Sequence, residues 1–196
     1  MISPKTLSEP EALEATKLLA FEMYNFRLLV RIYRSGNMLN LGLWKLVTSQ
    51  TLLLHTRVIW YFFYEEPKRK EDIVLGNFTG MTWKGESFTF PTKLMSPPAD
   101  LPGHKVKRTD IKIALDRMLV HFGRGRFEHD ENGKKQYHPG LEDYDQHFDE
   151  LEERIIKFRK GLPGSLRSAF DDRREQFADR DKRIVVPLKA APKLVW

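Results

Sequence analysis

The residues best suited to chemistry lie together on one predicted helix. Asp110, Arg117, His121 and Arg124 follow one another at spacings that place their side chains within about 60° around an α-helix. Arg126 follows closely in a glycine-flanked loop. One ribbon of this helix therefore offers a carboxylate, an imidazole and guanidinium groups.

This combination has two interpretations. Flanking positive charges lower the pKa of an imidazole, so His121 would act as a general base near neutral pH, supported by Arg117. Guanidinium groups bind phosphate, the role expected of Arg124 and Arg126, with Asp110 in support. In the alternative interpretation, Asp110 and Arg117 form an exposed helical ion pair, and His121 only caps the helix end.

A second polar pair, His55 and Arg57, lies on an apolar segment, where an unpaired charge is costly. Side chains two positions apart point roughly 160° apart around a helix, so the two do not act together without a bend. We expect a buried structural pair between Arg57 and a carboxylate, Asp72 or Asp110. In an alternative, His55 faces His121 across the bundle and forms a two-histidine site.

The composition sets further limits on function. No two histidines have the spacing of metal ligands, and the sequence signatures of P-loop, Rossmann and α/β-hydrolase proteins do not occur, so no cofactor is expected.

The chain has 196 residues, a net charge of +6 and a pI near 9.4, which favours anionic partners such as RNA or a nucleotide. With no cysteine, disulfides and thiolate chemistry are excluded, which agrees with a cytoplasmic protein. We expect neither a signal peptide nor a membrane span, because the first thirty residues carry four glutamates and the apolar stretch 39–64 is interrupted by polar and charged residues.

The first predicted helix has a clear start. Ser8 and Glu11 form a predicted capping box, and the helix should run to about Arg34, where Ser-Gly-Asn stops it. Four larger apolar residues are expected on its core face: Leu18, Phe21, Leu28 and Ile32.

The second predicted helix covers about 38–65 and is apolar nearly all round, which is typical of a helix at the centre of a bundle or at a dimer seam. Its apolar residues divide into two groups. The main stripe consists of Leu43, Val47, Leu54, Val58 and Tyr61, and the other side carries Leu41, Leu52, Ile59 and Phe63.

The middle of the chain has no helical pattern. Short helical turns are expected at 71–78, and glycine and proline then dominate residues 79–107. A loop of this length inside a compact domain is typical of a lid or a partner-binding segment. The helix with the polar cluster follows at about 109–123.

The clearest helix begins near Leu141, where apolar residues recur at alternating spacings of three and four as far as Leu162. Packing in an antiparallel bundle explains this repeat, with His147 on the polar side. A charged helix should follow at 165–180, and prolines predict an extended tail at 181–196. The sequence thus predicts an all-α fold, an up-and-down bundle of four or five helices over residues 1–180 with an insertion at 79–107.

The segment from Leu115 to His121, ending in Leu-Val-His, resembles the signature helix of the HEPN superfamily. Members of that superfamily are small all-helical domains, usually dimeric, and many are metal-independent RNases. Only three residues separate Arg117 from His121, fewer than in the family, and Asp116 or Leu115 stands where the family has its arginine. The resemblance therefore implies a degenerate or rearranged motif. Residues 40–127 also look like a group of uncharacterised bacterial proteins, through His55-Thr56-Arg57 and the residues that follow.

Three functions follow as hypotheses. The first is a HEPN-like domain that binds or cleaves RNA in a bacterial defence or toxin–antitoxin setting, with its site at a homodimer seam. The second is a non-catalytic interaction domain that binds a protein partner through residues 79–107 and the tail. The third is a bundle that binds a nucleotide or another small molecule with His55 and His121.

Overall fold

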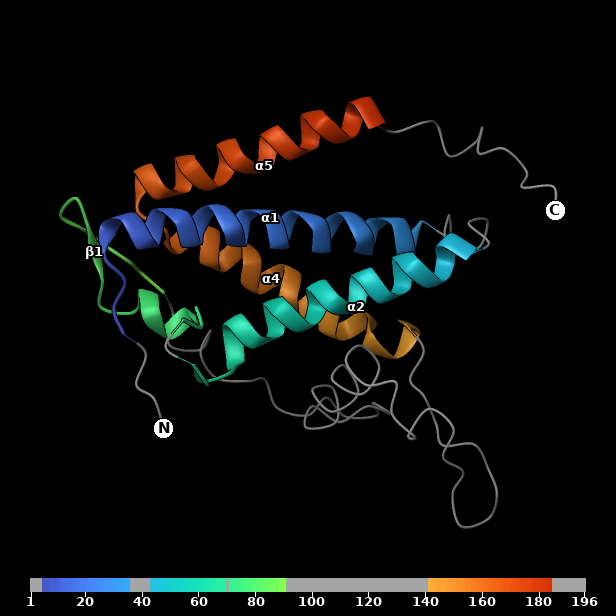
Figure 1. The fold of residues 1–196 in the computed structure, drawn as a ribbon, viewed down its shortest axis with the longest axis horizontal. Coiled ribbons are helices and arrows are strands. Elements are labelled where there is room, and N and C mark those ends of the chain that lie inside the picture. The colour runs from blue at the N-terminus through green and yellow to red at the C-terminus, as the bar shows by residue number, and fades with distance from the viewer. Residues whose placement is uncertain (1–4, 36–42, 70, 91–140, 185–196) are drawn as a thin grey trace, which may run out of the picture.

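The computed structural model describes residues 5–35, 43–69, 71–90 and 141–184, and these residues form an all-α bundle (Figure 1). Two helices, α1 (Glu9–Arg34) and α2 (Leu43–Tyr64), come from the first half of the chain, and α4 (Asp145–Gly161) and α5 (Gly164–Ile184) from the second. In Figure 1, α1 and α5 run in one direction and α2 and α4 in the other. Within the described ranges, no helix is long and apolar enough to cross a bilayer.

The central helix is α1, which packs against α2, α4 and α5. It starts as predicted, because the Ser8 amide donates a hydrogen bond to Glu11 Oε2 at 2.7 Å. Its predicted core face was wrong in part, since Leu18 is 60% exposed. With three helices around it, α1 buries a different set of residues, mainly Ala12, Ala15, Leu19, Met23, Phe26 and Val30.

In α2, the predicted main stripe is not the core. Val47, Leu54 and Val58 are exposed, whereas the opposite side packs inward. The apolar pattern could not separate the two sides, because both carry large aliphatic residues. The buried side consists of Leu52, Leu53, Ile59, Trp60, Phe62 and Phe63.

The segment after α2 folds back onto the bundle. It begins with the 3-10 turn η2 (Leu75–Phe78), where helical turns were predicted, and continues as the hairpin of β1 (Thr82–Trp83) and β2 (Glu86–Ser87). Lys84 and Gly85 both have positive φ, 49° and 83°, as a tight hairpin turn requires. The Trp83 ring is buried and its Nε1 donates to Ser165 Oγ at 2.6 Å.

The predicted helix that begins near Leu141 is confirmed as the 3-10 turn η5 (Leu141–Tyr144) followed by α4 (Asp145–Gly161). Its predicted apolar residues from Tyr144 to Leu162 are all buried. One residue differs, because His147 is only 5% exposed and its ring lies edge-on to Trp60 with 6.0 Å between centroids. Sequence alone treated His147 as polar, but α2 packs on this side of α4 and encloses it.

Phenylalanine rings fill the centre of the core around Phe158 of α4. Phe90 stacks on this ring with centroids 5.2 Å apart and 7° between planes, so the first part of the predicted insertion belongs to the core. The rings in contact with Phe158 come from α2, the 78–90 segment and α5: Phe62, Phe63, Phe78, Phe90 and Phe170.

Candidate functional site

The predicted catalytic ribbon lies outside the described residues. Asp110, Arg117, His121, Arg124 and Arg126 all fall within residues 91–140, so their arrangement remains a prediction. The same applies to the two-histidine site and to a contact between Arg57 and Asp110. The other two predicted site residues, on α2, can be placed.

His55 lies between α1 and α2 and pairs with a carboxylate that sequence analysis did not identify. Its Nδ1 is 2.7 Å from Glu22 Oε2, and the two side chains are 12% and 27% exposed. The Phe21 ring lies edge-on to the imidazole at a centroid distance of 6.4 Å. The pair is thus half-enclosed by apolar surface, an environment that strengthens a charged hydrogen bond.

Arg57 lines a groove of about 400 Å³ between α1, α2 and the loop at 71–73. Asp72, its predicted partner, lines the same groove, as does Glu22. Glu22 therefore connects the two predicted residues, since it contacts His55 and faces the space that Arg57 also faces.

The Asp72 carboxylate is held by three donors at the edge of this groove. Its Oδ2 accepts hydrogen bonds from the Tyr61 hydroxyl at 2.7 Å and from the amides of Lys68 and Arg69 at 2.8 and 2.9 Å. The bond from Tyr61 and those from the amides lower the pKa of Asp72. Burial and the hydrogen bond to Asp72 raise the pKa of Tyr61.

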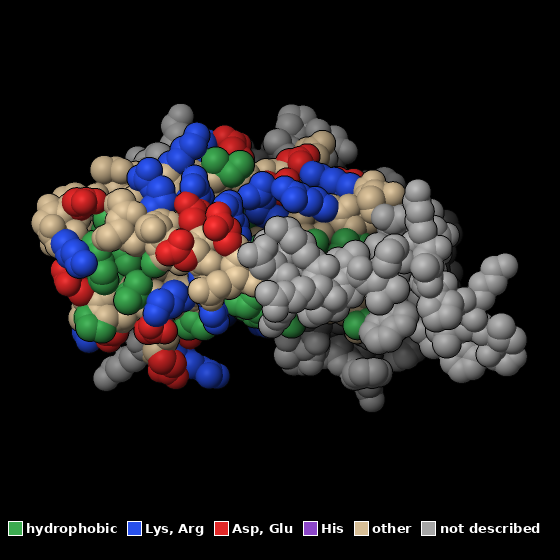
Figure 2. Space-filling model, turned by 90° about the horizontal axis from the view of Figure 1, so that it is seen from above, with side chains coloured by type: hydrophobic (Ala, Val, Ile, Leu, Met, Phe, Trp, Pro, Cys, Tyr) green, Lys and Arg blue, Asp and Glu red, His purple; other side chains and the backbone are tan. Residues whose placement is uncertain are grey.

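A second groove, of about 330 Å³, lies between α1, α4 and α5 and is lined by arginines. Arg27, Arg31, Arg159 and Arg174 face it, with Glu175 as its one acidic lining residue among those described. Figure 2 shows the face over which α5 lies, where Lys and Arg side chains gather beside Asp and Glu side chains. The sequence pattern does not predict this groove, because its arginines come from three helices.

Ion pairs hold most of these arginines in place. Arg159 donates two hydrogen bonds to Asp171, at 2.7 and 2.5 Å, and Arg27 pairs with Glu152 at 3.3 Å. Arg174 lies 4.0 Å from Asp171. Within the described part of the chain, the Arg31 side chain has no hydrogen-bond or ion-pair partner.

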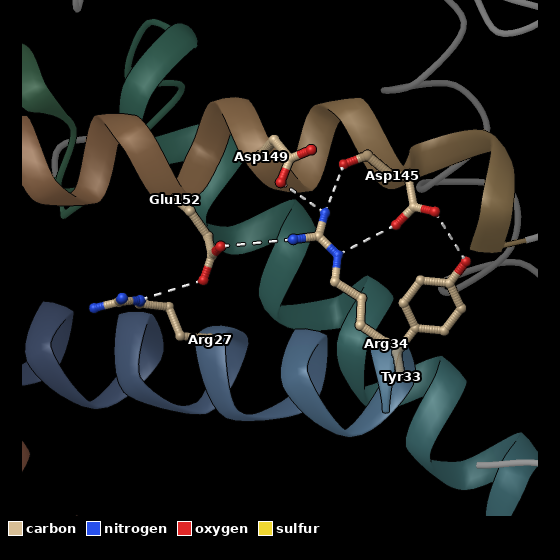
Figure 3. Close-up of polar contacts among 6 residues, drawn as sticks. All are labelled: Arg27, Tyr33, Arg34, Asp145, Asp149 and Glu152. Carbon is tan, nitrogen blue, oxygen red and sulfur yellow. Dashed lines mark hydrogen bonds and ion pairs between the residues drawn. The ribbon is translucent and has the colours of Figure 1, made fainter. Parts of the chain in front are cut away.

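A neighbouring network fixes α1 against α4, as Figure 3 shows. Arg34 reaches Asp149 at 2.8 Å and Asp145 at 3.5 Å, and the Tyr33 hydroxyl donates to Asp145 at 3.3 Å. Glu152 belongs to the same network and links it to the arginine groove through Arg27. We interpret this network as structural, since each of its two arginines and three carboxylates has a partner of opposite charge.

No family model, no curated protein and no solved structure matches this chain significantly. Among the described residues, no group of histidines and carboxylates could hold a metal ion. The placed residues therefore offer two grooves of opposite character, one lined by carboxylates and apolar groups and one by arginines. Among the described residues that line the two grooves, there is no serine, threonine, cysteine or lysine that could act as a nucleophile.

Proposed function

We propose that this helical domain binds RNA and that the arginine groove between α1, α4 and α5 contacts the phosphate backbone. The groove itself is the observation that carries the proposal. Guanidinium groups are the side chains best suited to phosphate, because their donors match its oxygens in pairs.

The ion pairs in the groove favour this role. Asp171 and Glu152 hold Arg159 and Arg27 in fixed positions, so less side-chain entropy is lost when a ligand binds. Arg31 adds an exposed positive charge that no described carboxylate neutralises. The exposed side chain of Ile156 and the half-buried Tyr24 provide apolar surface in the same groove, on which a base can pack.

The distribution of charge along the sequence supports the proposal. The whole chain has 33 Lys and Arg against 27 Asp and Glu, whereas the described residues contain 20 and 21. The entire positive excess therefore lies in the remaining residues, chiefly 91–140, which include the predicted phosphate-binding pair Arg124 and Arg126. We expect this segment to supply further backbone contacts.

Charge reversal at Arg31 tests the groove. We expect Arg31→Glu to weaken binding of a labelled single-stranded RNA oligonucleotide about tenfold in fluorescence anisotropy and to reduce the slope of log affinity against log salt by about one. Lys17→Glu is the matched control, since it changes the charge equally on α1 but lies outside the groove. Equal losses in both variants, or no RNA binding by the wild type at 100 mM salt, would refute the proposal.

The catalytic form of the proposal concerns His121 and depends on the sequence alone. If the HEPN resemblance extends to activity, His121 acts as the general base, Arg117 supports it, and Arg124 and Arg126 hold the phosphate. We expect His121→Ala to lower the rate of RNA cleavage by at least 100-fold while leaving anisotropy binding within about twofold. A wild type that binds RNA without cleaving it would leave the protein as a binding domain only.

A further inference from the structure

The groove between α1 and α2 combines an apolar floor with an acidic edge. Apolar groups from both helices and the following loop line it, and two of them are notably exposed, Leu18 at 60% and Val58 at 38%. Exposed apolar residues that cluster in a concave site are a feature of binding surfaces. The remaining apolar lining consists of Ala15, Leu19, Phe62 and Ile73.

The charges around this floor are mostly negative. Among the described residues that line the groove, Glu22, Glu71 and Asp72 are acidic and Arg57 is the one cation. Asp72 is held at the edge by Tyr61 and two backbone amides, and the exposed Glu71 side chain has no partner among the described residues. An apolar ligand with basic side chains and no acidic side chains therefore complements the groove.

One segment of the chain itself has this composition. Residues 185–196 read Val-Val-Pro-Leu-Lys-Ala-Ala-Pro-Lys-Leu-Val-Trp, with two lysines and no acidic side chain. We propose that the α1–α2 groove binds residues 185–196 of the same chain, with Leu194 and its apolar neighbours on the floor and the lysines at the acidic edge.

The described helices permit this contact within one chain. The ring centroids of Phe177 in α5 and Phe21 in α1 lie 5.0 Å apart. Phe21 in turn lies next to the Glu22–His55 pair at the edge of the groove. Ile184 ends α5 seven residues after Phe177, about 10 Å farther along the helix. Twelve residues span up to about 40 Å when extended, so the segment has enough length to return to Leu18 and Val58.

Disulfide trapping in the full-length chain tests the contact, because the chain contains no cysteine of its own. We expect Val58→Cys with Leu194→Cys to form an intramolecular disulfide at least fivefold faster than Val47→Cys with Leu194→Cys under mild oxidation. Val47 is the matched control, an exposed valine of the same helix that does not line the groove. Non-reducing electrophoresis and mass spectrometry at low micromolar concentration give the yields.

The charge complementarity has its own control. We expect Glu71→Lys to lower the trapping rate at least threefold and Glu14→Lys, an exposed α1 residue outside the groove, to leave it unchanged. Equal rates for the Val58 and Val47 pairs would refute the proposal. Disulfide-linked dimers instead of monomers would also refute it, because the occupant would then be a second copy. The inference does not depend on RNA binding, so the anisotropy experiments fail or succeed separately.

Discussion

At the scale of single residues, Glu22 is the most informative side chain, because it serves two neighbours. It holds His55 at 2.7 Å and faces the groove that Arg57 lines. Its partner lies 33 positions away on another helix. Sequence spacing identifies contacts along one helix, but a contact between helices depends on their packing. The residue pattern therefore indicated His55 but not its partner Glu22.

The ion pair between Asp171 and Arg159 should stabilise the fold in a way that depends on pH. Its hydrogen bonds from Arg159, together with the charges of nearby arginines, hold the pKa of Asp171 below its ordinary value of 3.8. We expect Asp171→Asn to lower the free energy of unfolding by about 0.5–1 kcal/mol at pH 7, a modest loss because Arg159 is partly exposed. Because the pKa of Asp171 is lowered in the folded state, its ionised carboxylate stabilises the fold fully above pH 3.8. This contribution is lost as the pH falls through the pKa of the folded state. The difference in the free energy of unfolding between wild type and Asp171→Asn should therefore persist at pH 5 and shrink below pH 3.8.

Urea denaturation at pH 7, 5 and 3 measures this difference. Asp172→Asn is the control, because Asp172 is exposed and makes no ion pair with a described residue. A difference that stays constant down to pH 3, or an equal effect of the control, would contradict the ion-pair explanation.

At the scale of elements, the contact between α4 and the 88–90 segment depends on Gly161. The Thr89 amide donates to the Gly161 carbonyl at 3.1 Å, and a Cβ added at Gly161 would lie 2.6 Å from the Phe90 ring and 2.7 Å from the Thr89 oxygen. Only glycine allows the segment to approach the helix end this closely.

We therefore expect Gly161→Ala to lower the free energy of unfolding by about 1–3 kcal/mol, although alanine favours a helix over glycine. Gly164→Ala is the matched control, since its added Cβ meets nothing nearer than Glu86 Oε2 at 3.8 Å. Chemical denaturation of both variants gives the comparison. A Gly161→Ala protein as stable as wild type would show that the segment moves aside at little cost.

The elements also show which sequence patterns were informative. The repeat in α4 predicted its buried face correctly, because one side of that helix is apolar and the other charged. The pattern in α2 failed, since Val47, Leu54 and Val58 are as apolar as the residues that the helix buries. His147 was assigned to the wrong side, because its burial depends on how α2 packs against α4.

At the scale of the whole molecule, the all-α bundle could be predicted, while the two grooves could not. Each groove requires residues from several helices at a known separation, and helical periodicity gives no such separation. The charge of the chain could be counted in advance, but its location could not: the described bundle is nearly neutral and the positive excess lies in the remaining residues. For this reason, net charge alone predicted an anionic partner without predicting where it binds.

The phenylalanine core joins residues from both sides of the 91–140 segment, as in the stacking of Phe90 on Phe158. Helix α1 likewise packs against α2 on one side and against α4 and α5 on the others. The described core is thus built jointly by two stretches that lie far apart in the sequence, 5–90 and 141–184. Because each stretch supplies rings and helix faces that the other covers, neither stretch can complete this core alone.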